Sequence, residues 1–164
     1  MIEYIVKVFD NRTEWYLNGQ LHREDGPAIE CSNGDKFWYL NGKYHREDGP
    51  ACEFDDGNKS LYLNGLFHRE DGPAIECSSG SKFWFLNGKR HRENGPACEY
   101  ANSNKLWYKN GKIHRLDGPA IEYSDGRKYW FIEGNELTEK EVLQRKKPCS
   151  GKKITVDGVD YELV

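Results

Sequence analysis

The sequence repeats itself with a fixed period of 23 residues. A period of this size is typical of repeat proteins, in which each unit buries its apolar face against its neighbours and cannot fold alone. Near-copies of His-Arg-Glu-Asp-Gly-Pro-Ala begin at the five histidines of the chain, which are His22, His45, His68, His91 and His114. A chain built from near-copies presents the same groups at every step, whereas a catalytic centre needs one asymmetric cluster. The period therefore predicts a repeat architecture and argues against an enzyme.

Turn signals inside each unit predict β-hairpins. Asn-Gly between aromatic-rich apolar runs is the strongest short hairpin signal, and it recurs at Asn18, Asn41, Asn64, Asn87 and Asn110. A second turn, such as Asn33-Gly34, closes the next strand, and Asp-Gly-Pro bends the chain between the two turns. No unit contains a helical pattern. We expect an all-β fold: an elongated antiparallel β-hairpin repeat array, running as a meander with about two strands per unit.

The repeat register divides the chain into two parts. Residues 1–134 form the array, which opens in mid-repeat, because residues 6–8 align with residues 29–31, so that the first unit caps the stack. Residues 135–164 copy no other segment. They predict a short C-terminal helix over 137–143, with Thr138 or Asn135 as its N-cap, and a terminal hairpin that turns at Asp157-Gly158.

Composition narrows the classes of partner. Charged residues make up 31% of the chain but nearly balance, with a net charge of -3, so a nucleic acid or an anionic membrane is not expected as the partner. No apolar run approaches the ~20 residues of a membrane-spanning helix. The first residues have no basic start, apolar centre or cleavage site of a secretory signal. We expect a cytoplasmic protein.

The cysteines of the repeats replace apolar residues. Cys31 and Cys77 share one position of the unit, and Cys52 and Cys98 share a second position that other units fill with isoleucine. Cysteine often serves as a small buried apolar residue. We expect this structural role in preference to a disulfide or a metal site.

The His-Arg-Glu-Asp segment brings an imidazole, a guanidinium and two carboxylates together in each unit. Ligands of one zinc ion lie ~2 Å from the metal, whereas histidines of successive units would lie roughly 10 Å apart. Asn94 and Leu116 also interrupt the pattern in the last copies. We expect no metal site, no cofactor and no catalytic residues, but a side-chain network in which His and Asp satisfy backbone groups and Arg pairs with Glu on neighbouring rungs.

The 23-residue period creates two aromatic ladders, that is, two series of aromatic residues at equivalent positions of successive units. Tryptophans share one position, where Leu61 fills the gap, and Tyr or Phe occupies the next position. Neighbouring residues of a strand face opposite sides, and leucines on the Trp side make that side the expected interior. The Tyr/Phe ladder would then be partly exposed beside the arginines, unless coiling of the array covers both sides. Tyr and Arg are favoured interface anchors. The expected partner-binding residues are Tyr16, Tyr39, Tyr62, Phe85, Tyr108, Phe131, Arg23, Arg46, Arg69, Arg92 and Arg115.

A basic segment follows the expected helix. It is either a solvated linker or a local anion contact, and the acidic balance of the whole chain weighs against nucleic acid there. Its residues are Arg145, Lys146, Lys147, Lys152 and Lys153.

Residues 41–45 and 110–114 both read Asn-Gly-Lys-x-His, and in this motif the chain resembles the MORN repeat family. It is similar still more closely to phage and giant-virus arrays with the signature LNGKxHREDGPA. The Arg-Glu-Asp-Gly-Pro after each histidine differs from the standard MORN unit, so lipid binding, sometimes attributed to MORN proteins, is not carried over. The resemblance implies a β-hairpin scaffold or interaction module without a catalytic motif.

The ladders and the resemblance together predict a non-enzymatic protein-binding module of viral type. Its expected partner is a host protein, for instance one of a defence system, which it inhibits or redirects in the host cytoplasm. Two alternatives stay open. Arg and Tyr between the rungs would suit a protein that sequesters a small ligand such as a nucleotide, and exposed strand edges or the C-terminal segment would suit a self-assembling structural protein.

Overall fold

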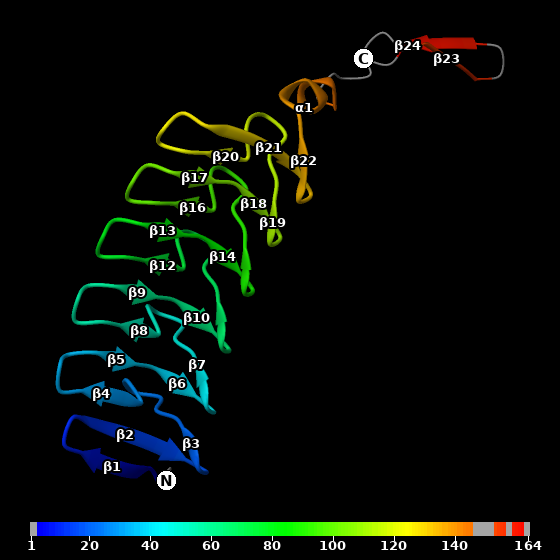
Figure 1. Cartoon of the computed structure of the whole chain (residues 1–164). Coiled ribbons are helices and arrows are strands. Elements are labelled where there is room, and N and C mark those ends of the chain that lie inside the picture. Colours follow the sequence, from blue (N-terminus) through cyan, green and yellow to red (C-terminus); the bar gives the residue numbers. More distant parts are fainter. Residues whose placement is uncertain (1–2, 146–152, 157–158, 163–164) are drawn as a thin grey trace.

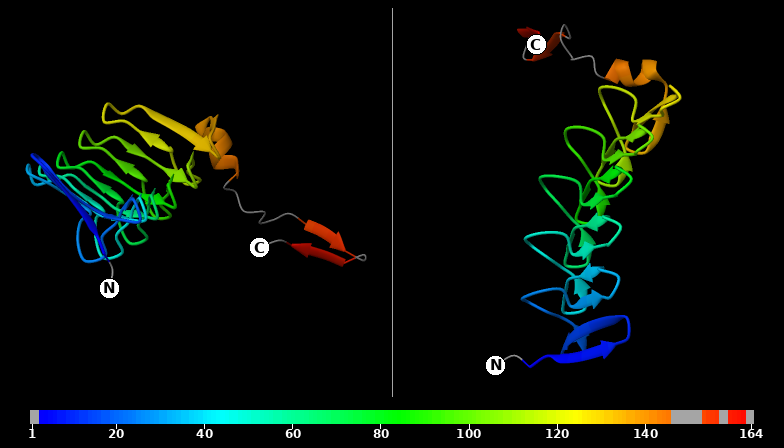
Figure 2. Two further views of the ribbon diagram at one scale, coloured as in Figure 1. Left: turned by 90° about the horizontal axis from the view of Figure 1, so that it is seen from below. Right: turned by 90° about the vertical axis from the view of Figure 1, so that its left-hand side faces the viewer.

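The array is one long antiparallel sheet with a column of small hairpins along its side (Figure 1). The computed structural model describes residues 3–145, 153–156 and 159–162. Successive units stack into an elongated arc and turn progressively about its long axis (Figure 2), as the inherent twist of β-strands requires. The expected all-β hairpin array is confirmed.

The long sheet has 14 strands and follows the order of the chain. Its strands are β1 (Ile5–Phe9), β2 (Arg12–Leu17), β3 (Gln20–Leu21), β4 (Ile29–Cys31), β5 (Lys36–Phe37), β8 (Cys52–Glu53), β9 (Lys59–Ser60), β12 (Ile75–Glu76), β13 (Lys82–Phe83), β16 (Cys98–Glu99), β17 (Lys105–Leu106), β20 (Ile121–Glu122), β21 (Lys128–Ile132) and β22 (Asn135–Leu137). β3 pairs only with β2.

Beside the sheet lie the lateral hairpins, each closed by an Asn-Gly turn. They are β6 (Tyr39–Leu40) with β7 (Lys43–Tyr44), β10 (Tyr62–Leu63) with β11 (Leu66–Phe67), β14 (Phe85–Leu86) with β15 (Lys89–Arg90), and β18 (Tyr108–Lys109) with β19 (Lys112–Ile113). In Asn41-Gly42 both residues have positive φ, 51° and 72°, as a two-residue hairpin turn requires.

Each complete unit thus contributes four short strands, where the sequence predicted about two. The strand formed by each aromatic run is interrupted at the tryptophan, because the backbone of this residue hydrogen-bonds to two different segments of the chain. The N–H of Trp38 donates to the carbonyl of Ala51 at the edge of the sheet, and its carbonyl accepts from the N–H of His45 on the lateral side. The strand therefore leaves the sheet at Trp38.

Strand register separates an apolar face of the sheet from a charged one. Phe37 lies opposite Cys52, while the adjacent Lys36 lies opposite Glu53. The same pairs recur in later units, with Phe83 opposite Cys98. Since alternate residues face opposite sides, glutamates and lysines alternate across the other face.

The apolar face of the sheet lies on the Tyr/Phe side of the array, although the Trp side, which was the expected interior, is half-buried as well. Cys52 and Cys98 are buried on the apolar face of the sheet. Tyr44 of the lateral hairpin contacts both Phe37 and Tyr39 from the same side. The alanines of the Gly-Pro-Ala bends are fully buried as well; they are Ala28, Ala51, Ala74, Ala97 and Ala120. The tryptophans are half-buried on the opposite side, where arginines stack on them, so both sides of the array are covered in part.

The second turn of the fourth unit lacks the glycine that the other units have. Its left-handed residue is Ser103, with φ 69°, at the position that Gly34 and Gly57 occupy in earlier units. The side-chain oxygen of Asn102 accepts a hydrogen bond from the N–H of Asn104 at 3.2 Å. Asn102 thus closes the turn through its side chain.

The array ends in helix α1 (Glu139–Arg145), which starts two residues after the predicted helix. Thr138 is its N-cap: Thr138 Oγ1 accepts from the N–H of Glu141, whose carboxylate accepts from the N–H of Thr138. This reciprocal pair is a capping box. Val142, 1% exposed, is the buried residue of the helix.

Two further strands, β23 (Lys153–Val156) and β24 (Val159–Glu162), form the expected terminal hairpin. Its predicted turn at Asp157-Gly158 lies outside the described residues. Among the described helical residues there is no apolar stretch long enough to cross a membrane.

Candidate functional site

The histidines link each unit to the next. The backbone N–H of Asn41 donates to Nδ1 of His22 at 3.1 Å, and the same bond joins His45 to Asn64 at 3.2 Å. The side-chain oxygen of Asn41 lies 3.0 Å from the same nitrogen of His22. The other ring nitrogen, Nε2, lies 3.7 Å from the carboxylate of Glu24. The histidines therefore serve the backbone, as the sequence predicted for this bend.

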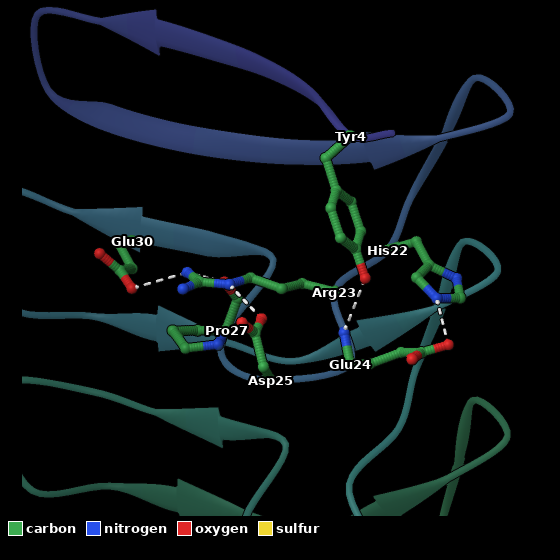
Figure 3. A network of polar contacts seen from close by, with 7 residues as sticks. All are labelled: Tyr4, His22, Arg23, Glu24, Asp25, Pro27 and Glu30. Atoms are coloured by element: carbon green, nitrogen blue, oxygen red, sulfur yellow. Dashed lines mark hydrogen bonds and ion pairs between the residues drawn. The ribbon is translucent and has the colours of Figure 1, made fainter. Parts of the chain in front are cut away.

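Arginine joins two carboxylates and a carbonyl of its own unit, as Arg23 does in the first unit (Figure 3). Arg23 donates through Nε to Asp25 at 3.0 Å, and through Nη1 to Glu30 at 3.1 Å and to the carbonyl of Pro27 at 3.2 Å. Its guanidinium also stacks on Trp15, 4.2 Å from the ring centroid. The predicted network is present, but its Asp binds Arg in place of the backbone, and its Arg–Glu pair stays within one unit.

The same arrangement recurs along the array. Arg46, Arg92 and Arg115 stack on Trp38, Trp84 and Trp107 at 4.1, 3.8 and 4.0 Å. Arg69 makes the same ion pairs, with Asp71 and Glu76, in the unit that has Leu61 in place of tryptophan. Hydrogen bonds from Arg46 and Arg69 lower the pKa of Asp48 and Asp71.

These contacts change the role of the candidate arginines. Their side chains are only 21 to 30% exposed, and their hydrogen bonds point into their own unit. A guanidinium already bound to two carboxylates gains little from a third partner. The five arginines therefore shape the surface and do not project from it as anchors.

The Tyr/Phe ladder forms part of a longer column of stacked rings. Tyr39, Tyr44, Tyr62, Phe67 and Phe85 follow one another with centroid distances of 4.2, 4.9, 4.2 and 5.0 Å. Burial raises the pKa of the Tyr39 hydroxyl, and raises that of Tyr62 to about 12. The rings are half-buried. The column is thus a packing element with a partly open side.

The alternate rings of this column were missed in the sequence. Tyr44 and Phe67 lie directly opposite Tyr39 and Tyr62 across the lateral hairpins. A two-residue turn fixes this cross-strand pairing, so the position before each histidine was the signal that would have found them. Arg90 occupies the same position one unit later and lies between Phe85 and Tyr108, 5.7 and 5.5 Å from their ring centroids.

The remaining candidates of the Tyr/Phe ladder lie at the two ends. The hydroxyl of Tyr16 donates a hydrogen bond to the carboxylate of Glu14 at 2.6 Å, and the ammonium of Lys7 lies 4.3 Å from the centroid of the Tyr16 ring. Phe131, on β21, accepts the N–H of Arg115 at its carbonyl. The ladder thus runs through the whole array, although its ends have partners of their own.

A row of four grooves follows the His-Arg-Glu-Asp bends, one between each pair of successive units. Groove 1 is lined by Trp38 and Leu40, groove 2 by Leu61 and Leu63, groove 3 by Trp84 and Leu86, and groove 4 by Trp107 and Lys109. The histidine, arginine and acidic residues of the two flanking units complete each lining. Their volumes range from about 450 to about 650 Å³.

The rims of the grooves are acidic. Glu47 and Asp48 are 85% and 84% exposed, and Glu70 and Asp71 are both 84% exposed. The exposed glutamates have only a histidine nearby, at 3.7 Å for Glu47 and 3.9 Å for Glu70. The units of Glu47 and Glu70 thus present unneutralised negative charge beside a half-buried apolar floor.

The basic segment is described only in part. Arg145 is the last residue of α1 and is exposed. Lys146, Lys147 and Lys152 lie outside the described residues, and Lys153 begins β23. Within the described part of the chain, no three His, Cys, Asp or Glu side chains are grouped as metal ligands.

Comparison with models of known protein families gives no match, and a search of the curated proteins gives none. The likeness to MORN arrays accordingly rests on the repeated motif itself.

Proposed function

We propose that this chain is a non-enzymatic module that binds another protein along the length of its array. The observation that supports the proposal is the row of four grooves at corresponding positions of successive units, of which grooves 1 to 3 have an apolar floor and an acidic rim. A surface repeated at regular steps suits a partner that lies across several units, as in other repeat arrays. The likeness to phage and giant-virus arrays makes a host protein the proposed partner.

The test is capture from a host-cell lysate followed by reconstitution. Proteins retained by the full chain are purified and titrated against it by calorimetry. The proposal expects one partner that binds saturably, with a fixed stoichiometry. Replacing Leu40 and Leu86 on the groove floors with Asp should weaken this binding, whereas Leu143→Asp, on the exposed side of α1, should leave it unchanged. A captured protein that does not bind after purification would contradict the proposal.

Self-assembly is the second candidate, because β1 is an exposed apolar edge. Ile5, Val6, Val8 and Phe9 are 60, 48, 77 and 43% exposed, and β1 pairs on one side only, with β2. An uncovered apolar edge strand is a template for pairing with another strand. If copies join there, sedimentation velocity should show a mass that grows with concentration, and Val8→Lys should abolish the growth. A constant monomer mass would exclude this candidate.

A further inference from the structure

We infer that the four grooves bind an extended cationic peptide in the polyproline II conformation, with a lysine or arginine at every third residue. The inference rests on the proposed function and names the chemistry of the partner at that surface. Three observations carry it: the charge of the rims, the apolar floors and the spacing of the units.

Charge selects a cationic partner. In every unit except the fourth, where Asn94 replaces the aspartate, the arginine is held by its own aspartate and by the glutamate seven residues later, so its charge is already matched. The glutamate between them, such as Glu47, remains 85% exposed. Glu24, Glu47 and Glu70 repeat this arrangement on the rims of grooves 1 to 3, whereas Glu93 lies 3.1 Å from His91 and 3.6 Å from Lys109. A side-chain ammonium or guanidinium entering from solvent would meet one carboxylate that is not engaged by arginine or lysine in each of the first three units.

The floors select a ligand with apolar surface between its charges. In grooves 1 and 3 a tryptophan lies beside a leucine, with the arginine of the same network stacked on the tryptophan in both units. The stacked guanidinium holds the ring in place in the lining of the groove. Proline-rich segments dock on aromatic-lined grooves of this kind because their conformation is fixed before binding.

Spacing selects the period of the ligand. Each unit adds two strands to the long sheet, so successive grooves are about 10 Å apart. A polyproline II helix has three residues per turn and rises ~3.1 Å per residue, so equivalent side chains recur every ~9.3 Å on one face. In a β-strand every third side chain faces the opposite side, which does not match the grooves. A regular peptide can therefore place one cation in each groove in two conformations. One is a polyproline II helix with a cation at every third residue, and the other is an α-helix with a cation at every seventh residue.

Groove 4 departs from the others in a way that reduces its charge. Asn94 and Leu116 replace two of the acidic residues, and Lys109 replaces the floor leucine and lies 3.6 Å from Glu93. The cationic stretch should therefore occupy grooves 1 to 3 and leave groove 4 to an uncharged part of the ligand. This places its cations over units 1 to 4 of the array.

The test uses the full chain and a fluorescent peptide that repeats Pro-Pro-Lys four times, followed by fluorescence anisotropy. A peptide of the same composition with its lysines contiguous tests spacing. A helical peptide with lysine at every seventh residue tests conformation. The variant Glu24→Gln/Glu47→Gln/Glu70→Gln removes the rim charges, and Glu3→Gln/Asp10→Asn/Glu136→Gln removes three exposed carboxylates elsewhere as a matched control. Circular dichroism verifies that both variants fold.

The inference expects tight binding of the Pro-Pro-Lys repeat, weakened about tenfold in the rim variant and unchanged in the control. Binding should also weaken with added salt, because the rims are open to solvent. Equal or tighter binding of the contiguous-lysine or helical peptide would overturn it, as would an equal loss in both variants. If a purified protein partner binds the rim variant normally, the proposed function stands and the grooves are not its site.

Discussion

His45 accepts a hydrogen bond from the backbone N–H of Asn64, nineteen residues further along the chain. Asn64 is the left-handed first residue of the next Asn-Gly turn, with φ 54°. The bond therefore joins the bend of one unit to the hairpin tip of its neighbour. Repeated from His22 to His114, it fixes the spacing of the lateral hairpins and hence of the grooves between them.

Asn64→Ala should lower the free energy of unfolding by about 1–2 kcal/mol, because alanine is disfavoured in the left-handed conformation and loses the side-chain contact to His45. Asn64→Gly should cost less, since glycine tolerates this conformation. Urea unfolding of the two variants measures the difference. If Ala and Gly are equally harmful, the left-handed backbone is not the cause.

Leu61→Trp should stabilise the protein by about 0.5–1 kcal/mol, because Arg69 then gains the aromatic ring that the other arginines stack on. The reverse change in a neighbouring unit, Trp38→Leu, should destabilise by a similar amount. Chemical unfolding of both variants measures this pair. A stabilising Trp38→Leu would show that cation–π stacking does not hold these units together.

Glu14 predicts a dependence of stability on pH. Burial raises its pKa, but hydrogen bonds from Tyr16 and Arg12 outweigh this and lower the pKa below its ordinary value. Ionised Glu14 then stabilises the fold above its ordinary pKa, and this contribution disappears as the pH falls through the lowered value.

Glu14→Gln should accordingly reduce the free energy of unfolding at neutral pH and have a smaller effect near pH 3, below the ordinary range of a glutamate. Urea unfolding at both pH values measures the effect. Glu3→Gln, at an exposed position, is the control and should change neither value. A Glu14→Gln effect that grows toward low pH would reverse the assigned sign.

Cys52 and Cys98 should resist alkylation in the folded protein. Burial raises the pKa of Cys52 to about 12, and burial, opposed by the charge of Arg90, raises that of Cys98 to about 11. Since the thiolate is the reactive form, both should react with iodoacetamide only after unfolding. Mass spectrometry of digested protein measures modification at each position. Cys77, which is half-buried, serves as the internal comparison and should be modified sooner.

Much of the fold was predictable because it depends on local rules. Asn-Gly turns, Asp-Gly-Pro bends and the 23-residue period predict a hairpin array, and the Thr138 capping box begins the C-terminal helix. The break at Trp38 was not predictable, because it depends on Ala51 and His45, two backbone partners from different parts of the chain. When the backbone of a strand changes its hydrogen-bonding partner part-way along, the pattern of apolar and polar residues in the sequence does not change.

For the candidate site, the sequence predicted the ladders but not the roles of their members. The arginines were expected as exposed anchors, yet Arg23 is occupied by Asp25, Glu30 and Trp15. The contact between Arg23 and Trp15 depends on how the bend returns across the strand. The carboxylates that bind no arginine, such as Glu47, could be identified only once the structure showed which carboxylates bind one.

The sequence alone therefore determined the period, the turns and the hairpins, because these follow from the conformational preferences of a few residues and from repetition. The tertiary structure alone decided what covers each face and which charges remain free. Neighbouring side chains of a strand project to opposite faces, and which face is covered depends on the groups that the rest of the chain places over it. In this protein the arginines cover the tryptophans, and the glutamates between them remain in solvent.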